Sequence, residues 1–475
     1  MSDTRIEKDS LGELKVPADA YYGVQTARAV ANFQISGMRP FPEFVDAVVR
    51  IKRAAAKVHA DLGTLTRERA DAIQAAADEV LAGKLRDQFV VDVFQAGAGT
   101  SHHMNVNEVL ANRGIELLGG KRGDYSILNP NDHLNRGQST NDVIPTAIRL
   151  AGLEAARPVL KALDTLCAAL EAKGREFSGI VKSGRTHLQD AVPATLGQEF
   201  TAWSFTFLDH RCRLENALEE LRELGIGGSA AGTGLNTDPG YRPAICAELS
   251  RLTGEKLVPA RNLMSAMQSM APFVSVSSAL RGLALDLTKL GNDLRLLSSG
   301  PNTGLAEIDL PAVQPGSSIM PGKVNPVLAE MTNMVAFQVI GNDTVIAYAS
   351  QAGQLELNVM MPVIAFDLVF SLRITGTAVD SLARKCIAGI TASPERCLRY
   401  AEGSLSIVTV LNPHIGYARA ADVAKTMLKT GKTAREILLE EKILDAAKLD
   451  EILKLMPMTV PPDAEAKAGT KPHWA

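Results

Sequence analysis

The chain has 475 residues and the composition of an ordinary globular protein, with 46% hydrophobic and 22% charged residues. Its formal net charge is −3 and its basic residues form no stripe, so neither nucleic acid nor a membrane surface is an expected partner. The length suffices for about three domains of roughly 150 residues each.

The first residues and the cysteines indicate a cytoplasmic protein. The opening segment, MSDTRIEKD, is too polar for the apolar core of a signal peptide. No uninterrupted apolar run approaches the ~18 residues of a membrane span, and the apolar segment 360–370 contains Asp367. The five cysteines are scattered and form no CxxC pair, which favours free thiols in a reducing compartment.

The pattern along the chain predicts a mainly α, three-domain protein. Residues 1–138 mix short helical patterns with loops rich in glycine and asparagine and form the N-terminal, mostly helical domain. Residues 139–390 show helical periodicity over long segments and form a central long-helix bundle domain. Residues 391–475 form a small, charged C-terminal helical domain, and its end, from Pro457, is predicted to be a loose tail.

Three long helices are predicted in the central domain. Residues 195–224 contain no proline and no glycine after Gly197, and Gly225 is a suitable C-cap. Residues 271–299 and 327–350 are apolar nearly all the way round. A helix without a polar face must be covered on all sides, so these two lie within a bundle, at a large subunit interface, or both.

Four polar, glycine-containing segments interrupt this helical background. Together they are rich in hydroxyl and amide groups and contain a lysine, two arginines and several histidines. They are residues 97–108 (GAGTSHHMNVNE), 129–142 (NPNDHLNRGQSTND), 183–190 (SGRTHLQD) and 314–326 (QPGSSIMPGKVNP). Neutral donors with one or two cations are what a pocket for a dicarboxylate requires.

Other kinds of site fit these segments poorly. The spacing after Gly316 is one residue too long for a phosphate-binding P-loop, and Val324 replaces the hydroxyl residue that holds magnesium. Ala230 occupies the third glycine position of a dinucleotide loop. The adjacent His102 and His103 point apart on any regular backbone, and no HxxxH spacing or GxSxG elbow occurs. We therefore expect no cofactor and no metal.

Residues 316–326, GSSIMPGKVNP, resemble the signature loop of the aspartase/fumarase superfamily. Other motifs match in order and spacing: GTS at 99–101, QSTND at 138–142, GRTHLQD at 184–190, GTGLN at 232–236 and GQLELN at 353–358. The resemblance extends from about Arg5 to about Met458. It implies a soluble lyase that releases fumarate, a bundle that forms the core of a homotetramer, and sites shared between subunits.

Within the superfamily, the segments RIEKDSLG (5–12) and DAYYGVQT (19–26), together with Thr140, resemble the ammonia-lyase branch more than the hydratase branch. Three departures concern the substrate. His103 stands where the family usually has Asn, Asn302 where it usually has Arg, and Met361 where the ammonia-lyase branch usually has Glu. The leaving group therefore stays open between ammonia, water and a substituted amine.

The chemistry of such an elimination suggests roles for the motif residues. A proton leaves the carbon beside a carboxylate, and the developing charge accumulates on that carboxylate, which needs preorganised donors. Thr100, Ser139 and Thr140 are the candidates for this carboxylate, although Ser139 and Thr140 also precede a helical pattern and suit helix capping.

The remaining candidates follow from the resemblance. Thr186, Lys323 and Asn325 would bind the second carboxylate. His187 and Asn141 would contact the amino group or orient nearby donors, with a structural histidine as the alternative.

Ser317 would be the general base, used as an alkoxide, and Ser318 would donate to the charged carboxylate. If Ser317 is not the base, it merely hydrogen-bonds the substrate. Glu307, Asn131 and Asp132 form a second tier that either tunes the site or caps helices. A non-enzymatic helical scaffold is the remaining alternative, which the donor-rich segments disfavour.

Overall fold

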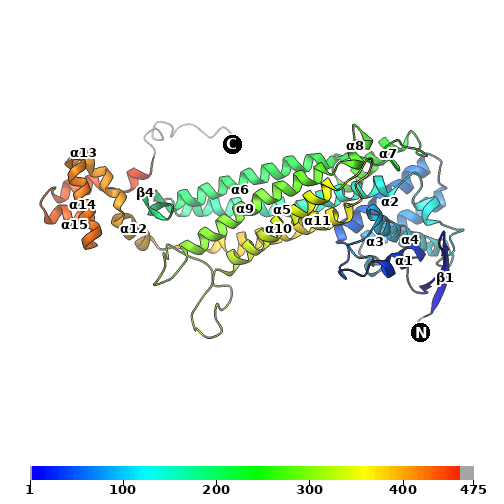
Figure 1. Ribbon diagram of the computed structural model, residues 1–475, viewed down its shortest axis with the longest axis horizontal. Helices are drawn as coiled ribbons and strands as arrows, with labels where there is room; N and C mark the ends of the chain where they lie inside the picture. Colours follow the sequence, from blue (N-terminus) through cyan, green and yellow to red (C-terminus); the bar gives the residue numbers. More distant parts are fainter. Residues whose placement is uncertain (1–2, 461–475) are drawn as a thin grey trace. The chain divides into compact units, whose positions relative to one another are not determined.

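The computed structural model describes residues 3–460 and is mostly helical, which confirms the predicted fold class (Figure 1). The chain divides into two compact units. Unit 1 contains residues up to Lys161, His210–Leu285 and Met334–Thr377, and unit 2 contains Ala162–Asp209, Asp286–Asn333 and residues from Ala378 onward. The expected domain borders at 138/139 and 390/391 stay predictions.

Unit 1 contains an antiparallel hairpin and a group of packed helices. They are β1 (Thr4–Asp9), β2 (Gly12–Pro17), α1 (Val24–Asn32), α2 (Pro42–Asp61), α3 (Arg67–Leu81), α4 (Thr100–Leu117), α7 (Tyr241–Thr253) and α8 (Leu263–Gln268). Helices α2, α3 and α4 pack on one another, and α7 packs on α2 (Figure 1). Their fully buried side chains include Ile51, Ile73 and Leu110, so the apolar stripes of these helices face a common core.

Five long helices contribute residues to both units. They are α5 (Thr140–Glu176), α6 (Leu196–Glu219), α9 (Ala271–Leu297), α10 (Val327–Gln351) and α11 (Met361–Lys385). The predicted helices at 271–299 and 327–350 are confirmed almost to the residue as α9 and α10.

The predicted helix 195–224 is wrong at its C-terminal end. Helix α6 stops at Glu219, and the strand β5 (Glu223–Leu224) follows a short 3-10 turn. Strand β5 pairs in parallel with β6 (Val258–Pro259), so the backbone is extended where the sequence pattern alone favours helix. Gly225 follows a strand and is not a helix cap.

Helix α10 is not covered on all sides within the chain. Met334, Phe337, Val345 and Tyr348 recur at spacings that place them on one face, and they are 58%, 58%, 41% and 67% exposed. A row of exposed large apolar side chains is typical of an interaction surface.

Unit 2 contains the hairpin of β3 (Val181–Thr186) and β4 (Gln189–Thr195), and the short pair β7 (Ile308–Asp309) and β8 (Thr391–Ala392). Its C-terminal helices are α12 (Pro394–Gly403), α13 (Asn412–Ile415), α14 (Tyr417–Thr430), α15 (Ala434–Glu440) and α16 (Ala446–Ile452), drawn in orange and red (Figure 1). Buried side chains such as Leu411, Val423 and Leu438 form their own small core. The predicted tail begins inside a 3-10 turn, Met456–Thr459, and its part beyond residue 460 lies outside the described residues.

Residues 361–389, which include α11, are long and apolar enough to cross a membrane by composition. Within the chain, however, 67% of their most apolar window is buried. We therefore interpret α11 as a core helix.

Candidate active site

The predicted site residues fall into two groups, one in each unit. Unit 1 carries Thr100, Ser139, Thr140 and Asn141. Unit 2 carries Thr186, His187, Ser317, Ser318, Lys323 and Asn325.

Thr100 is the first residue of α4, and an unusual backbone precedes it. Gly97, Ala98 and Gly99 all have positive φ angles, so the chain turns sharply just before the helix starts. A Cβ on Gly99 would lie 3.0 Å from the side chain of Ile144 in α5, which keeps the turn close to that helix. The exposed Thr100 hydroxyl donates to the carbonyl of Gly97 at 2.5 Å.

The start of α5 meets the start of α4 through two threonines. The hydroxyl oxygens of Thr100 and Thr140, the first residues of α4 and α5, are 3.2 Å apart. The first N–H groups of a helix lack partners in the helix and carry a partial positive charge. Two helix starts side by side suit an anion. The structure brings Thr100 and Thr140 together in unit 1, and their binding of a carboxylate stays a prediction.

Ser139 caps α5, and Asp142 completes the cap. The Ser139 hydroxyl accepts from the N–H of Asn141 at 3.2 Å, and the Asp142 carboxylate accepts from the N–H of Ser139 at 2.9 Å. The same carboxylate accepts from Gly227 and Ser229, both at 3.0 Å, and thereby attaches the loop around residue 229 to the start of α5. Burial raises the pKa of Asp142 to about 6, although the backbone donors favour its charged form.

Asp142 was not singled out from the sequence, although the sequence carries a signal for its capping role. A serine followed three residues later by an acidic residue, before a helical pattern, is the spacing of a capping box. Asn141 was expected to contact substrate. Here its side-chain amide donates to the carbonyl of Ala230 at 2.8 Å, so it also attaches the neighbouring loop, and its role toward substrate stays a prediction.

A buried lysine lies beneath the loop before α5, and sequence reasoning missed this residue too. Lys52 of α2 is 1% exposed and donates to side-chain oxygens of Asn135 and Gln138 at 3.0 and 2.9 Å. Burial lowers the pKa of Lys52 well below its usual range. Its position on the apolar face of α2, beside Val48 and Ile51, could have indicated a buried role.

In unit 2, His187 lies at the tip of the β3–β4 hairpin. Thr186 pairs with Gln189, so His187 and Leu188 form a two-residue turn, with φ angles of 52° and 61°. Each left-handed residue with a Cβ costs about 1 kcal/mol or more, and such strain concentrates at functional sites. Thr186 and His187 are exposed, as residues that bind a ligand must be.

A buried ion cluster holds strand β3. The fully buried Glu307 lies 2.8 Å from Lys182 and 2.8 Å from Arg185, two residues of β3, and Lys182 also pairs with Glu199 at 2.8 Å. Two cations directly beside Glu307 compensate its burial. Glu307 therefore has a structural role at β3, which is not the helix capping considered for it, and whether it also tunes the site stays a prediction.

The loop from Gly316 to Asn325 closes on itself. The N–H of Gly316 donates to the carbonyl of Lys323 at 2.8 Å, and the amide of Asn325 donates to the carbonyl of Gly316 at 2.8 Å. A Cβ on Gly316 would lie 2.6 Å from that Lys323 carbonyl, so only glycine fits. Ser318 and Lys323 are exposed on this loop.

Ser317 has an environment that favours a negatively charged oxygen. Its Oγ accepts from the N–H groups of Ile319 and Met320 at 3.2 and 3.0 Å. Donors aimed at a hydroxyl oxygen stabilise its alkoxide form. Within the described residues these are the donors that the loop supplies to Ser317.

The other second-tier candidates and two of the positions that depart from the family pattern lie outside the groups of residues described above. Asn131 and Asp132 are exposed, and their N–H groups donate to the side chain of Asn129 in a turn. Among the departures from the family pattern, Asn302 is exposed and Met361 is completely buried at the start of α11.

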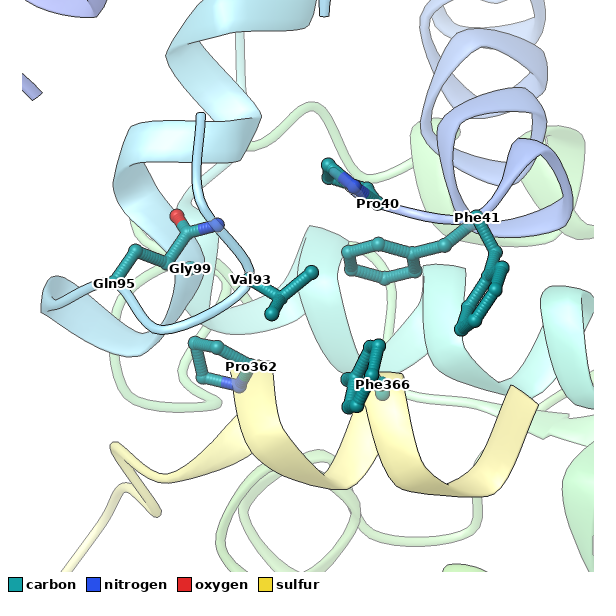
Figure 2. A pocket seen from close by; sticks show the side chains of 9 residues that line it. Pro40, Phe41, Val93, Gln95, Gly99, Pro362 and Phe366 are labelled. Atoms are coloured by element: carbon teal, nitrogen blue, oxygen red, sulfur yellow. The ribbon is translucent and has the colours of Figure 1, made fainter. Parts of the chain in front are cut away.

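An apolar pocket of about 350 Å³ lies next to the start of α4 in unit 1. Its lining includes Phe41 and Phe366, whose rings stack with centroids 5.4 Å apart, and Val93, Gln95 and Pro362 (Figure 2). Its lining contains no charged side chain, so it does not suit a dicarboxylate.

Comparisons with known proteins agree with these motifs. Residues 12–341 match the family described as "Lyase", and residues 407–460 match the family described as "Fumarase C C-terminus". An aspartate ammonia-lyase of Pseudomonas aeruginosa is 50% identical over 95% of this chain and 96% of its own length, and one of Bacillus subtilis is 47% identical over 96% of each.

Two solved structures are similar over nearly the whole chain. A fumarate lyase:delta crystallin of Brucella melitensis, bound to cobalt, is 50% identical with a TM-score of 0.94, covering 97% of this chain and all of that one. A class II fumarase of Schistosoma mansoni is 38% identical with a TM-score of 0.92, over the same shares. The chain therefore belongs to this family of lyases, the aspartase/fumarase superfamily that its motifs resemble.

Proposed function

We propose that the chain is an aspartate ammonia-lyase, which converts L-aspartate to fumarate and ammonia. The observation that carries this proposal is the Ser317 hydroxyl oxygen, which receives two backbone N–H groups within the signature loop. The near-full-length identity with aspartate ammonia-lyases supports ammonia as the leaving group.

In this mechanism, Ser317 as an alkoxide removes a proton from the carbon beside one carboxylate. The electron pair of the broken C–H bond moves into that carboxylate, which becomes a doubly charged aci-carboxylate. The pair then returns to form the C=C bond of fumarate while the C–N bond breaks and ammonia leaves. The step that needs most help is the first one, because a carbon beside a carboxylate is a weak acid.

The charged intermediate is held by donors that are already in place. The converging starts of α4 and α5, with Thr100, Ser139 and Thr140, supply them in unit 1. Each well-placed donor contributes about 3 kcal/mol to stabilising such a charge.

Ser318 would add a further donor from unit 2, and Thr186, Lys323 and Asn325 would bind the second carboxylate. His187 and Asn141 would contact the amino group.

The exposed apolar row on α10 supports the proposal that the protein is a homotetramer with sites shared between subunits. Burial of Met334, Phe337, Val345 and Tyr348 against other copies of the chain removes large apolar surfaces from water. The cysteines of the described chain form no disulfides, which supports a reducing, cytoplasmic location. The absence of a cofactor and of a metal stays a prediction.

A hydratase that interconverts malate and fumarate is the second candidate, and the similarity to the Schistosoma mansoni fumarase favours it. A lyase acting on a substituted aspartate is the third, because His103, Asn302 and Met361 depart from the family pattern.

The deciding experiment follows the absorbance of fumarate with purified protein and L-aspartate, malate or N-substituted aspartates. We expect L-aspartate to react fastest without any added cofactor. A faster reaction with malate, or with a substituted aspartate alone, would replace the assignment by the second or third candidate.

A further inference from the structure

We propose that His103 is a positioning residue: it donates a hydrogen bond to the hydroxyl oxygen of Thr140 and so directs the Thr140 proton toward a bound carboxylate. This inference deepens the proposed function and rests on it, because it concerns the carboxylate that the starts of α4 and α5 would hold.

His103 reaches Thr140 from the buried side. It lies three residues after Thr100 on α4 and is 1% exposed, and its Nδ1 is 2.9 Å from the Thr140 hydroxyl oxygen. Thr140 itself is half-buried at the first position of α5. The imidazole therefore contacts the hydroxyl from within the protein and leaves its other side open to a ligand.

The surroundings of His103 decide which nitrogen carries the proton. Burial, Lys52 and His102 together hold the pKa of His103 well below its usual range, so the ring is neutral and carries one proton. Its Nε2 is buried without a hydrogen-bond partner. An unpaired buried N–H costs more than an unpaired buried lone pair, and nearby Lys52 favours a lone pair. The proton therefore lies on Nδ1, which donates to Thr140.

Without a ligand, the Thr100 hydroxyl donates to a backbone carbonyl of its own turn. It lies 2.5 Å from the carbonyl of Gly97, the shortest of its contacts. The Thr140 oxygen accepts from His103, so the Thr140 proton must point elsewhere. At 3.2 Å the Thr100 hydroxyl is a second, longer donor to the Thr140 oxygen, so among the described residues the Thr140 proton has no acceptor in this pair. A carboxylate is a strong acceptor for a hydroxyl proton, so a bound substrate would take it.

The neighbouring histidine provides a matched comparison. His102 is completely buried on the same turn of α4, and burial lowers its pKa to about 3. Its ring stacks on Phe44 with centroids 4.8 Å apart, and neither of its nitrogens has a hydrogen-bond partner. His102 thus has the same residue type and burial without the contact to Thr140.

The first test compares substitutions at these two positions. An asparagine side chain carries its amide nitrogen at about the same place as Nδ1 of histidine, so His103→Asn keeps the donor and His103→Leu removes it. We expect His103→Leu to lower kcat/KM for L-aspartate by about 10- to 100-fold. His103→Asn should restore it to within about threefold of the wild type, and His102→Leu should change it by less than threefold.

The second test asks whether His103 acts through Thr140. We expect Thr140→Val to lower kcat/KM by about 100-fold or more. Adding His103→Leu to Thr140→Val should then have little further effect, because the group that it positions is gone. A merely structural histidine would give losses that multiply in the double variant. Multiplied losses, or equal losses in His103→Asn and His103→Leu, would overturn the proposal.

Calorimetric titration with succinate, a dicarboxylate that cannot react, separates this inference from the assignment of the reaction. If the wild type does not convert L-aspartate, the proposed function fails. Tight succinate binding by the wild type and His103→Asn, and equally weakened binding by His103→Leu and Thr140→Val, would still support the inference. Equal succinate affinity in all four proteins, or no binding to the wild type, would overturn it.

Discussion

Single side chains in this protein are distinguished by the donors that surround them. Ser317 and Ser318 are adjacent in the signature loop, yet the two N–H groups of Ile319 and Met320 converge on Ser317. Similarly, His102 and His103 are equally buried, and His103 alone of the two contacts a hydroxyl of the site. Residue type and burial therefore do not assign a role at this scale, and the hydrogen-bond partners do.

The role of Ser317 leads to a prediction. Ser317→Ala should lower kcat by about 10³-fold or more, because it removes the base, and should leave the melting temperature nearly unchanged, because the side chain is not part of a core. Steady-state kinetics and a thermal melt check both expectations. Ser126→Ala, at an exposed loop serine of the other unit, is the control and should be active. A kcat near that of the wild type would remove Ser317 from the role of base.

Among the secondary-structure elements, helix starts carry most of the organisation. Helices α4 and α5 begin at the two threonines of the proposed carboxylate site. Glu108 of α4 caps α1: its buried carboxylate accepts from the N–H groups of Gly23, Gln25 and Thr26 and from the Thr26 hydroxyl, at 2.6 to 3.1 Å. One side chain thus attaches the N-terminal helix to the helix that starts at Thr100.

This cap can be tested without any assay of activity. Glu108→Gln places an NH₂ group where backbone N–H groups need an acceptor, so it should lower the free energy of unfolding by about 2–4 kcal/mol. Urea unfolding measures this loss. Glu68→Gln, at an exposed position in the first turn of α3, should cost only a few tenths of a kcal/mol. Equal stability of the two variants would mean that the carboxylate does not hold α1.

At the scale of the whole molecule, α10 is the element that a single chain leaves incomplete. Its apolar row is exposed in one copy, and the proposed catalytic residues belong to two units. Both features are accounted for if the active protein is a homotetramer in which each site takes segments from different chains.

Mixing two inactive variants tests this proposal. Thr100→Ala and Lys323→Ala are unfolded and refolded together in equal amounts, so that chains assort at random. If the two segments of a site come from different chains, each is intact in half of the cases, and about a quarter of the sites regain both. Wild-type protein refolded in the same way sets the reference activity. Hybrid tetramers as inactive as their parents would place both segments of each site in one chain.

Local chemistry determined much of this protein. The continuous apolar character of residues 271–299 and 327–350 predicts α9 and α10 almost to the residue, because an apolar segment of this length in a globular protein favours a buried helix over a strand. The signature loop is identified from its resemblance to a family motif, and the hydrogen bond between Gly316 and Asn325 that closes it lies within the same short segment.

Contacts between distant segments were decided only by the tertiary structure. Helix α6 ends early because Glu223 and Leu224 pair with residues more than thirty positions away. Asp142 and Glu307 acquire their roles from loops and strands that the sequence order keeps far apart. A pattern of residues indicates which groups are polar or apolar, but the partner of a buried polar group depends on which segments fold against each other, and that is a property of the folded chain.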